Sequence, residues 1–137
     1  MAGTVWNAAL HHRLMARFQM PSLGGVVSKA ANSQTANNLA LLACALERYR
    51  LAQGGYPDTL AALVPTHIKK VPQDIINGKP LVYHKKADGT FILYSVGWND
   101  KDDDGVLVVR DSGSVIPTEG DWVWQYTSPK IEVTEKK

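Results

Sequence analysis

The most constraining feature of this sequence is a long stretch, from Val26 to Ala52, that contains neither glycine nor proline. It is rich in alanine and leucine, and apolar residues recur every three or four positions, which predicts an amphipathic α-helix. Gly54 and Gly55 follow after Gln53 and supply the left-handed conformation that commonly ends a helix. A single helix about 40 Å long needs a second layer of structure to bury its apolar face.

A second, shorter helix is predicted upstream of this stretch. Residues 5–20 also carry apolar side chains at helical spacing, and Pro21 with the glycine pair that follows is expected to interrupt the pattern. The segment after Thr127 is polar and is expected to be a flexible tail. The predicted organisation is therefore residues 1–25, a short amphipathic helix and a break; residues 26–126, the main domain; and residues 127–137, the tail.

The rest of the main domain is predicted to be a short helix followed by strands. A Tyr-Pro step after the glycines leads into "DTLAALVP", which has the length of one or two helical turns. The runs "LVYHKK" and "TFILYSVG" flank Asp88-Gly89, a common hairpin turn, and "VLVVR" and "DWVWQY" are further strand candidates. Helices first and strands later indicate an α+β fold, in which a long N-terminal helix packs on a three- to four-stranded antiparallel sheet.

Composition excludes several classes of function. The net charge is only +2 and the basic residues are scattered, which argues against a nucleic-acid partner. The longest apolar run, "LALLACAL", is far too short to span a membrane, and its single cysteine, Cys44, is expected to be a buried thiol. No nucleophile elbow, phosphate-binding glycine loop or zinc-protease motif occurs, so we predict a protein that is not an enzyme.

The stretch "WNDKDDDG" places several carboxylates between two predicted strands. From Asp100 to Gly105 it follows the pattern D-x-D-x-D-G, the first half of a calcium-binding loop. A strand would carry Asp111, at the twelfth position, away from the others, so an EF-hand is not expected. Two interpretations remain open, a solvated hairpin tip and a strand-to-strand calcium loop, and we favour calcium. The candidate ligands are Asn99, Asp100, Asp102, Asp103 and Asp104.

The tryptophans near the C-terminus allow two interpretations. In "DWVWQY", alternation sends Trp122, Trp124 and Tyr126 to one face of a strand. Packing of that face against the long helix would make it part of the core. If it were exposed instead, it would be a surface for binding a protein or a glycan.

From Asn38 to Gly105 the order of features resembles the soluble domain of the major pseudopilin of type II secretion and its relatives in the type IV pilin-like family. In that family a long helix leads through a Tyr-Pro step to a "D-P-x-G-x-P-x-x-Y" motif and then to a "S-x-G-x-D-G" calcium loop. The first motif is matched by Asp74, Gly78, Pro80 and Tyr83. The second is matched by Ser95, Gly97, Asn99 and the run from Asp100 to Asp104, with Asn99 standing where the family usually has aspartate.

The resemblance implies a pilin-like structural or interaction domain with a calcium-stabilised loop, working in a secretion or pilus-like assembly. Protein partners or self-association, and a periplasmic or extracellular location, follow from it. The apolar N-terminal half-helix of the family has no counterpart upstream of Pro21, which leaves open an anchor supplied by a further segment. The alternative is a stand-alone module that recognises a protein or glycan through its tryptophan-bearing strand, without metal.

Overall fold

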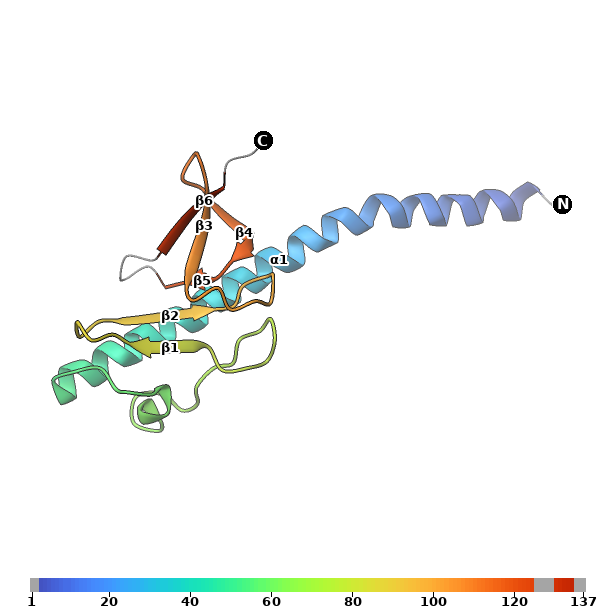
Figure 1. The fold of residues 1–137 in the computed structure, drawn as a ribbon. Coiled ribbons are helices and arrows are strands. Elements are labelled where there is room, and N and C mark those ends of the chain that lie inside the picture. Colours follow the sequence, from blue (N-terminus) through green and yellow to red (C-terminus); the bar gives the residue numbers. More distant parts are fainter. Residues whose placement is uncertain (1–2, 125–129, 135–137) are drawn as a thin grey trace. The chain divides into compact units, whose positions relative to one another are not determined.

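The computed structural model describes residues 3–124 and 130–134. The chain divides into two compact units, one ending at Ala30 and one beginning at Ala31. The first unit holds the N-terminal part of helix α1, which runs from Gly3 to Gln53 (Figure 1). The second unit holds the remainder of α1 together with every described strand.

The predicted break near residue 21 is wrong. Helix α1 continues through Pro21, Gly24 and Gly25. A proline inside a helix removes one backbone hydrogen bond and costs about 3 kcal/mol, and each glycine costs about 1 kcal/mol. These penalties weaken a helix locally, but they end it only where the backbone finds better hydrogen bonds elsewhere. The sequence around Pro21 offers no strand pattern that would provide them.

The core of the second unit forms along one face of α1. Leu42 and Leu46 are fully buried and Leu39 is 4% exposed, so the residues at helical spacing pack inward as the sequence predicts. They meet Tyr56, the short 3₁₀ helix η1 (Leu60–Leu63) and the strands in one continuous cluster. The cluster is completed by Ala45, Ile68, Leu81, Phe91 and Leu93.

Cys44 is exposed, so the prediction of a buried thiol is wrong. Successive residues of a helix are rotated by about 100°. Once Leu42 and Leu46 turn toward the strands, Leu41 and Cys44 fall on the opposite side, and Leu41 is 51% exposed. The apolar run does not itself reveal which of its residues faces the sheet.

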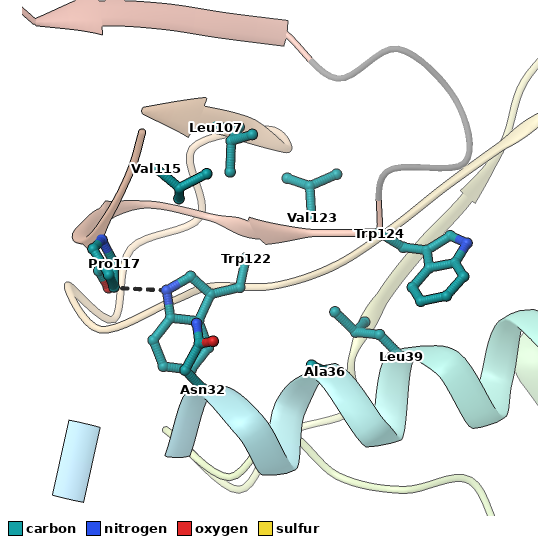
Figure 2. A pocket seen from close by; sticks show the side chains of 9 residues that line it. All are labelled: Asn32, Ala36, Leu39, Leu107, Val115, Pro117, Trp122, Val123 and Trp124. Atoms are coloured by element: carbon teal, nitrogen blue, oxygen red, sulfur yellow. Dashed lines mark hydrogen bonds between the residues drawn. The ribbon is translucent and has the colours of Figure 1, made fainter. Parts of the chain in front are cut away.

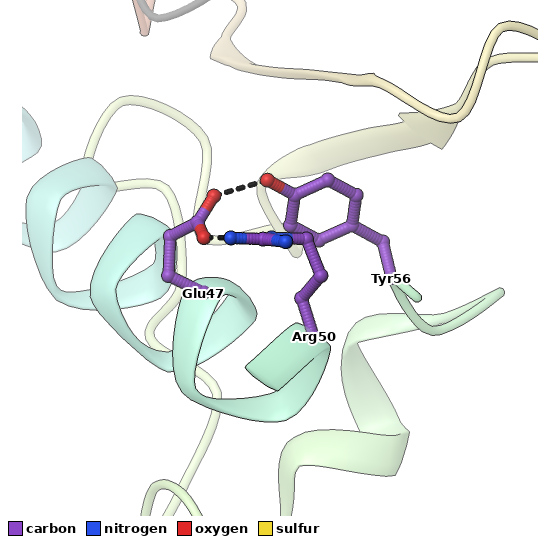
Figure 3. A network of polar contacts seen from close by, with 3 residues as sticks. All are labelled: Glu47, Arg50 and Tyr56. Carbon is purple, nitrogen blue, oxygen red and sulfur yellow. Dashed lines mark hydrogen bonds and ion pairs between the residues drawn. The ribbon is translucent and has the colours of Figure 1, made fainter. Parts of the chain in front are cut away.

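A polar network fixes the C-terminal end of α1 to the chain that follows (Figure 3). The Tyr56 hydroxyl donates a hydrogen bond to Glu47, and the Arg50 Nε lies 2.9 Å from the other Glu47 oxygen. The Arg50 guanidinium also lies 5.8 Å from the centre of the Tyr56 ring. The predicted helix end is confirmed: the Gly54 N–H donates to the Arg50 carbonyl at 2.8 Å, with Gly54 at φ 82°.

The first sheet contains the predicted hairpin. Strands β1 (Val82–Lys85) and β2 (Phe91–Ser95) pair antiparallel across the Asp88-Gly89 turn. The short strand β5 (Trp122–Val123) pairs antiparallel with the other edge of β2, which gives the order β1-β2-β5. Trp122 is 5% exposed, and Trp124 packs against the core cluster beside α1. The core interpretation of this tryptophan face is therefore confirmed; Tyr126 lies outside the described residues.

The second sheet has the order β4-β3-β6. Strand β3 (Val106–Arg110) pairs antiparallel with β4 (Val115–Gly120) and parallel with β6 (Lys130–Thr134). Strand β6 lies in the segment predicted to be a flexible tail, so that prediction is wrong for these five residues. Its backbone is ordered by hydrogen bonds to β3, a strand distant in sequence, which a local pattern does not reveal.

The predicted α+β class is confirmed, with a long N-terminal helix packed against antiparallel strands in the manner of a pilin-like head. The strands are divided between two three-stranded sheets, and one pair, β3 with β6, is parallel. Among the described residues, no helix combines the length and the apolar character needed to cross a membrane.

Candidate metal site at the acidic loop

The acidic loop connects β2 to β3 and follows the central strand of the first sheet. Two of its aspartates, Asp100 and Asp104, adopt positive φ angles of 54° and 56°. Aspartate tolerates this left-handed conformation better than most residues, because its short polar side chain can hydrogen-bond to nearby backbone groups. The Asp104 N–H, for example, donates to the Asp102 carboxylate at 3.1 Å. The loop is thus a series of tight turns.

The five predicted ligands do not all point the same way. The Asn77 amide donates to Asp100 at 3.1 Å, which holds that carboxylate toward the loop before β1. The Asn99 amide donates to Asp103 at 2.9 Å, so Asn99 supports a candidate ligand through its nitrogen. The Tyr94 hydroxyl, from β2, donates to Asp102 at 2.8 Å.

The loop is organised around Asp121, a residue that the sequence did not single out. Asp121 directly precedes β5 and is fully buried. One of its carboxylate oxygens, Oδ2, accepts the backbone N–H of Gly105 at 2.7 Å and that of Asp103 at 3.2 Å. The other oxygen, Oδ1, is buried and has no hydrogen-bond partner. A buried, unpaired carboxylate oxygen is costly unless a proton or a cation shares the site.

Two acidic side chains of the loop, Asp102 and Asp103, act electrostatically on Asp121. Burial raises the pKa of Asp121 to about 6, the two backbone hydrogen bonds oppose that rise, and the charges of Asp103 and Asp102 add to it. Burial also raises the pKa of Tyr94, with further contributions from Asp102, Asp121 and Asp104. The structure therefore brings Asp102 and Asp103 to the vicinity of Asp121 and Asp104 to the vicinity of Tyr94, whereas Asp100 is hydrogen-bonded to Asn77.

A second buried carboxylate ties the loop to the chain before β1. Asp74 is 2% exposed, and its two oxygens accept the backbone N–H groups of Ile76 at 3.0 Å and Val96 at 3.2 Å. The Asp74 backbone also exchanges hydrogen bonds with Lys79 and Gly78. The motif that leads into the sheet thus holds the end of β2, where the acidic loop begins.

The carboxylates of the acidic loop and of Asp121 are ligands that fit a hard cation such as calcium, which prefers carboxylate and carbonyl oxygens. Within the described part of the chain, no three acidic, histidine or cysteine side chains already converge in the arrangement of a preformed metal site. The buried Asp121 Oδ1 has no hydrogen-bond partner, and a proton or a cation would relieve its electrostatic cost. As predicted, β3 intervenes between the loop and Asp111, so the arrangement is not that of an EF-hand.

The raised pKa of Asp121 predicts an unusual pH dependence of stability. Because the folded protein holds this proton more tightly than the unfolded chain, the free energy of unfolding should fall as the pH rises from about 4 to about 6. We expect Asp121 to contribute a loss of about 2 kcal/mol between pH 4 and pH 7 in the presence of a chelator. Denaturant unfolding at several pH values, compared with Asp121→Asn, measures this contribution.

The exposed Asp111 provides the control for that experiment. Asp111→Asn should leave the slope of the wild type unchanged, whereas Asp121→Asn should flatten it. Equal slopes for the wild type and Asp121→Asn would show that the buried carboxyl does not titrate in this range.

The comparisons with known proteins leave the site to be interpreted from its geometry. No protein-family model matches this sequence, and no curated protein matches it.

Proposed function

We propose that this protein is a non-enzymatic, pseudopilin-like structural or interaction domain whose acidic loop is stabilised by calcium. The observation that carries the proposal is the buried Asp121 carboxylate, with one unpaired oxygen, at the centre of an aspartate-rich loop. This loop lies in a domain built on a long helix. The pseudopilin family that the sequence resembles carries its calcium loop in the same kind of domain. Its partners would be proteins or further copies of itself, as in a secretion or pilus-like assembly.

Calcium would relieve the electrostatic cost of the loop. Four aspartates lie between residues 100 and 104, and Asp121 lies beneath them. A divalent cation beside the Asp121 Oδ1 would offset repulsion from Asp102 and Asp103, the neighbours that raise the pKa of Asp121. Asp104 is exposed and can approach from solvent. We assign Asp102, Asp103, Asp104 and Asp121 as the side chains that hold the ion, with Asn99 positioning Asp103 and Asp100 on the outer side of the loop.

A calcium site of this kind suits a location outside the cytoplasm. Sites with few ligands and solvent access bind with dissociation constants of about 10⁻⁴ to 10⁻³ M, so they fill only where calcium is millimolar. We therefore place the protein in the periplasm or outside the cell.

Calcium is expected to stabilise the folded protein by mass action. At 10 mM calcium, a dissociation constant in this range gives about 1 to 3 kcal/mol, and we expect the melting temperature to rise by about 5 to 10 °C relative to the chelated protein. Asp121→Asn and the double variant Asp102→Asn/Asp104→Asn should each abolish most of the rise. Thermal melts in calcium, in magnesium and in chelator measure it.

Asp111→Asn is the matched control, because it removes an exposed carboxylate that β3 separates from the loop and should keep the full calcium response. A wild-type melting temperature that is the same in calcium and in chelator would contradict the calcium proposal. It would leave the structural role of the domain to be tested separately, by its association with other copies or proteins.

A further inference from the structure

The second unit contains an apolar cleft that the calcium proposal does not use (Figure 2). Its volume is about 580 Å³, within the range of about 300 to 1,000 Å³ that holds small molecules in proteins. Its walls are formed by α1, by strands β3 and β4, and by the segment around β5. The lining residues are Asn32, Ala36, Leu39, Leu107, Val115, Pro117, Trp122, Val123 and Trp124.

The walls of the cleft are held in place by the core. Leu39, Leu107 and Trp122 are each 4 to 5% exposed, so their positions are fixed by packing behind them. The Trp122 indole N–H donates to the Pro117 carbonyl at 2.9 Å, which fixes the ring between β4 and α1 (Figure 2). At the rim, Val115 is 37% exposed. A preformed apolar cleft avoids the entropic cost of ordering its walls when a ligand binds.

The chemistry of the lining limits what the cleft can hold. None of the nine lining residues carries a charge, and Asn32 is the single polar side chain among them. The Trp122 N–H is already satisfied by Pro117 and is not available to a ligand. A charged ligand would lose its hydration without gaining a partner, and a glycan would leave most of its hydroxyl groups unpaired.

We propose that this cleft binds an uncharged, predominantly apolar small molecule, with at most one polar group directed at Asn32. Ring-bearing ligands are favoured, because the partly exposed indole of Trp124 offers an apolar surface for stacking. The inference goes beyond the calcium-stabilised head and does not depend on it, since none of the candidate calcium ligands lines the cleft.

The test uses N-phenyl-1-naphthylamine, an uncharged aromatic probe whose fluorescence increases in apolar surroundings. We expect saturable binding at one site per chain, with energy transfer from tryptophan to the probe. The anionic sulfonate analogue of the probe should bind about tenfold or more weakly, because no cation lines the cleft. Equal binding of the two probes would overturn the proposed ligand class.

Two variants locate the site. Ala36→Phe places a ring in the cleft and should weaken probe binding by about tenfold or more, whereas Ala30→Phe makes the same change at an exposed helix position outside it. Val115→Asp adds a charge at the exposed rim and should weaken binding without filling the cleft. Thermal melts establish that each variant is folded.

Three outcomes contradict the proposal. The first is a wild-type protein that shows no saturable probe binding. The second is unchanged binding in folded Ala36→Phe and Val115→Asp. The third is a dimer that forms with increasing protein concentration, that Ala36→Phe disrupts and that the probe does not compete with. This result would assign the cleft to a second copy of the chain instead.

Discussion

Replacing Asp74 with alanine is expected to lower the free energy of unfolding by about 4 kcal/mol. The substitution removes the acceptor for the N–H groups of Ile76 and Val96, and the second of these bonds is buried. A buried donor without a partner costs about 1 to 3 kcal/mol, and here two donors lose the same carboxylate. Chemical denaturation at neutral pH measures the change, and the loop that follows Val96 should become accessible to hydrogen exchange.

Asp58 is the matched control for Asp74. Its carboxylate forms an ion pair with Lys85 at 3.0 Å, but its side chain is 89% exposed. Exposed pairs contribute about 0 to 1 kcal/mol, so Asp58→Ala should leave the stability almost unchanged. If the two alanine variants were equally stable, the buried carboxylate would not be the group that holds the end of β2.

Gly97→Ala is expected to have a similar effect, also about 4 kcal/mol, for a different reason. Gly97 has a φ of 68°, which costs a residue with a side chain about 1 to 2 kcal/mol. In addition, a Cβ atom at this position would lie 2.3 Å from the backbone oxygen of Gly120, so the start of the acidic loop and the end of β4 would have to separate. Forced overpacking of this kind costs about a further 1 to 3 kcal/mol.

A substitution at Gly113 separates the cost of backbone strain from the cost of steric overlap. Its φ is 80°, but a Cβ atom there would meet nothing within 4 Å. Gly113→Ala should therefore show the backbone strain alone, about 1 to 2 kcal/mol, when the two variants are compared by chemical denaturation. A Gly97→Ala variant as stable as Gly113→Ala would mean that the close approach to Gly120 is relieved at little cost. Because Gly120 precedes Asp121, Gly97→Ala should also weaken the response to calcium.

The acidic loop illustrates how far the sequence predicts the candidate site. The aspartates between residues 100 and 104 are close together in the sequence, and the alternate spacing of Asp100, Asp102 and Asp104 predicts a site for a hard cation. Asp121 is separated from them in the sequence by β3 and β4, and the spacing of the loop aspartates does not point to it. A useful signal would have been the aspartate directly before a strongly apolar strand, a position that can be buried only if the carboxylate is hydrogen-bonded.

What the sequence determined by itself is the set of structures that depend on neighbours along the chain. The helix from Val26 to Ala52 and the hairpin around Asp88-Gly89 follow from residue spacing and turn chemistry, because their hydrogen bonds are local. Only the tertiary structure decided which face of α1 is buried and that β6 pairs with β3. It also decided that Asp121 lies beneath the acidic loop. Each of these depends on contacts between segments far apart in sequence, whose free energy no local pattern contains.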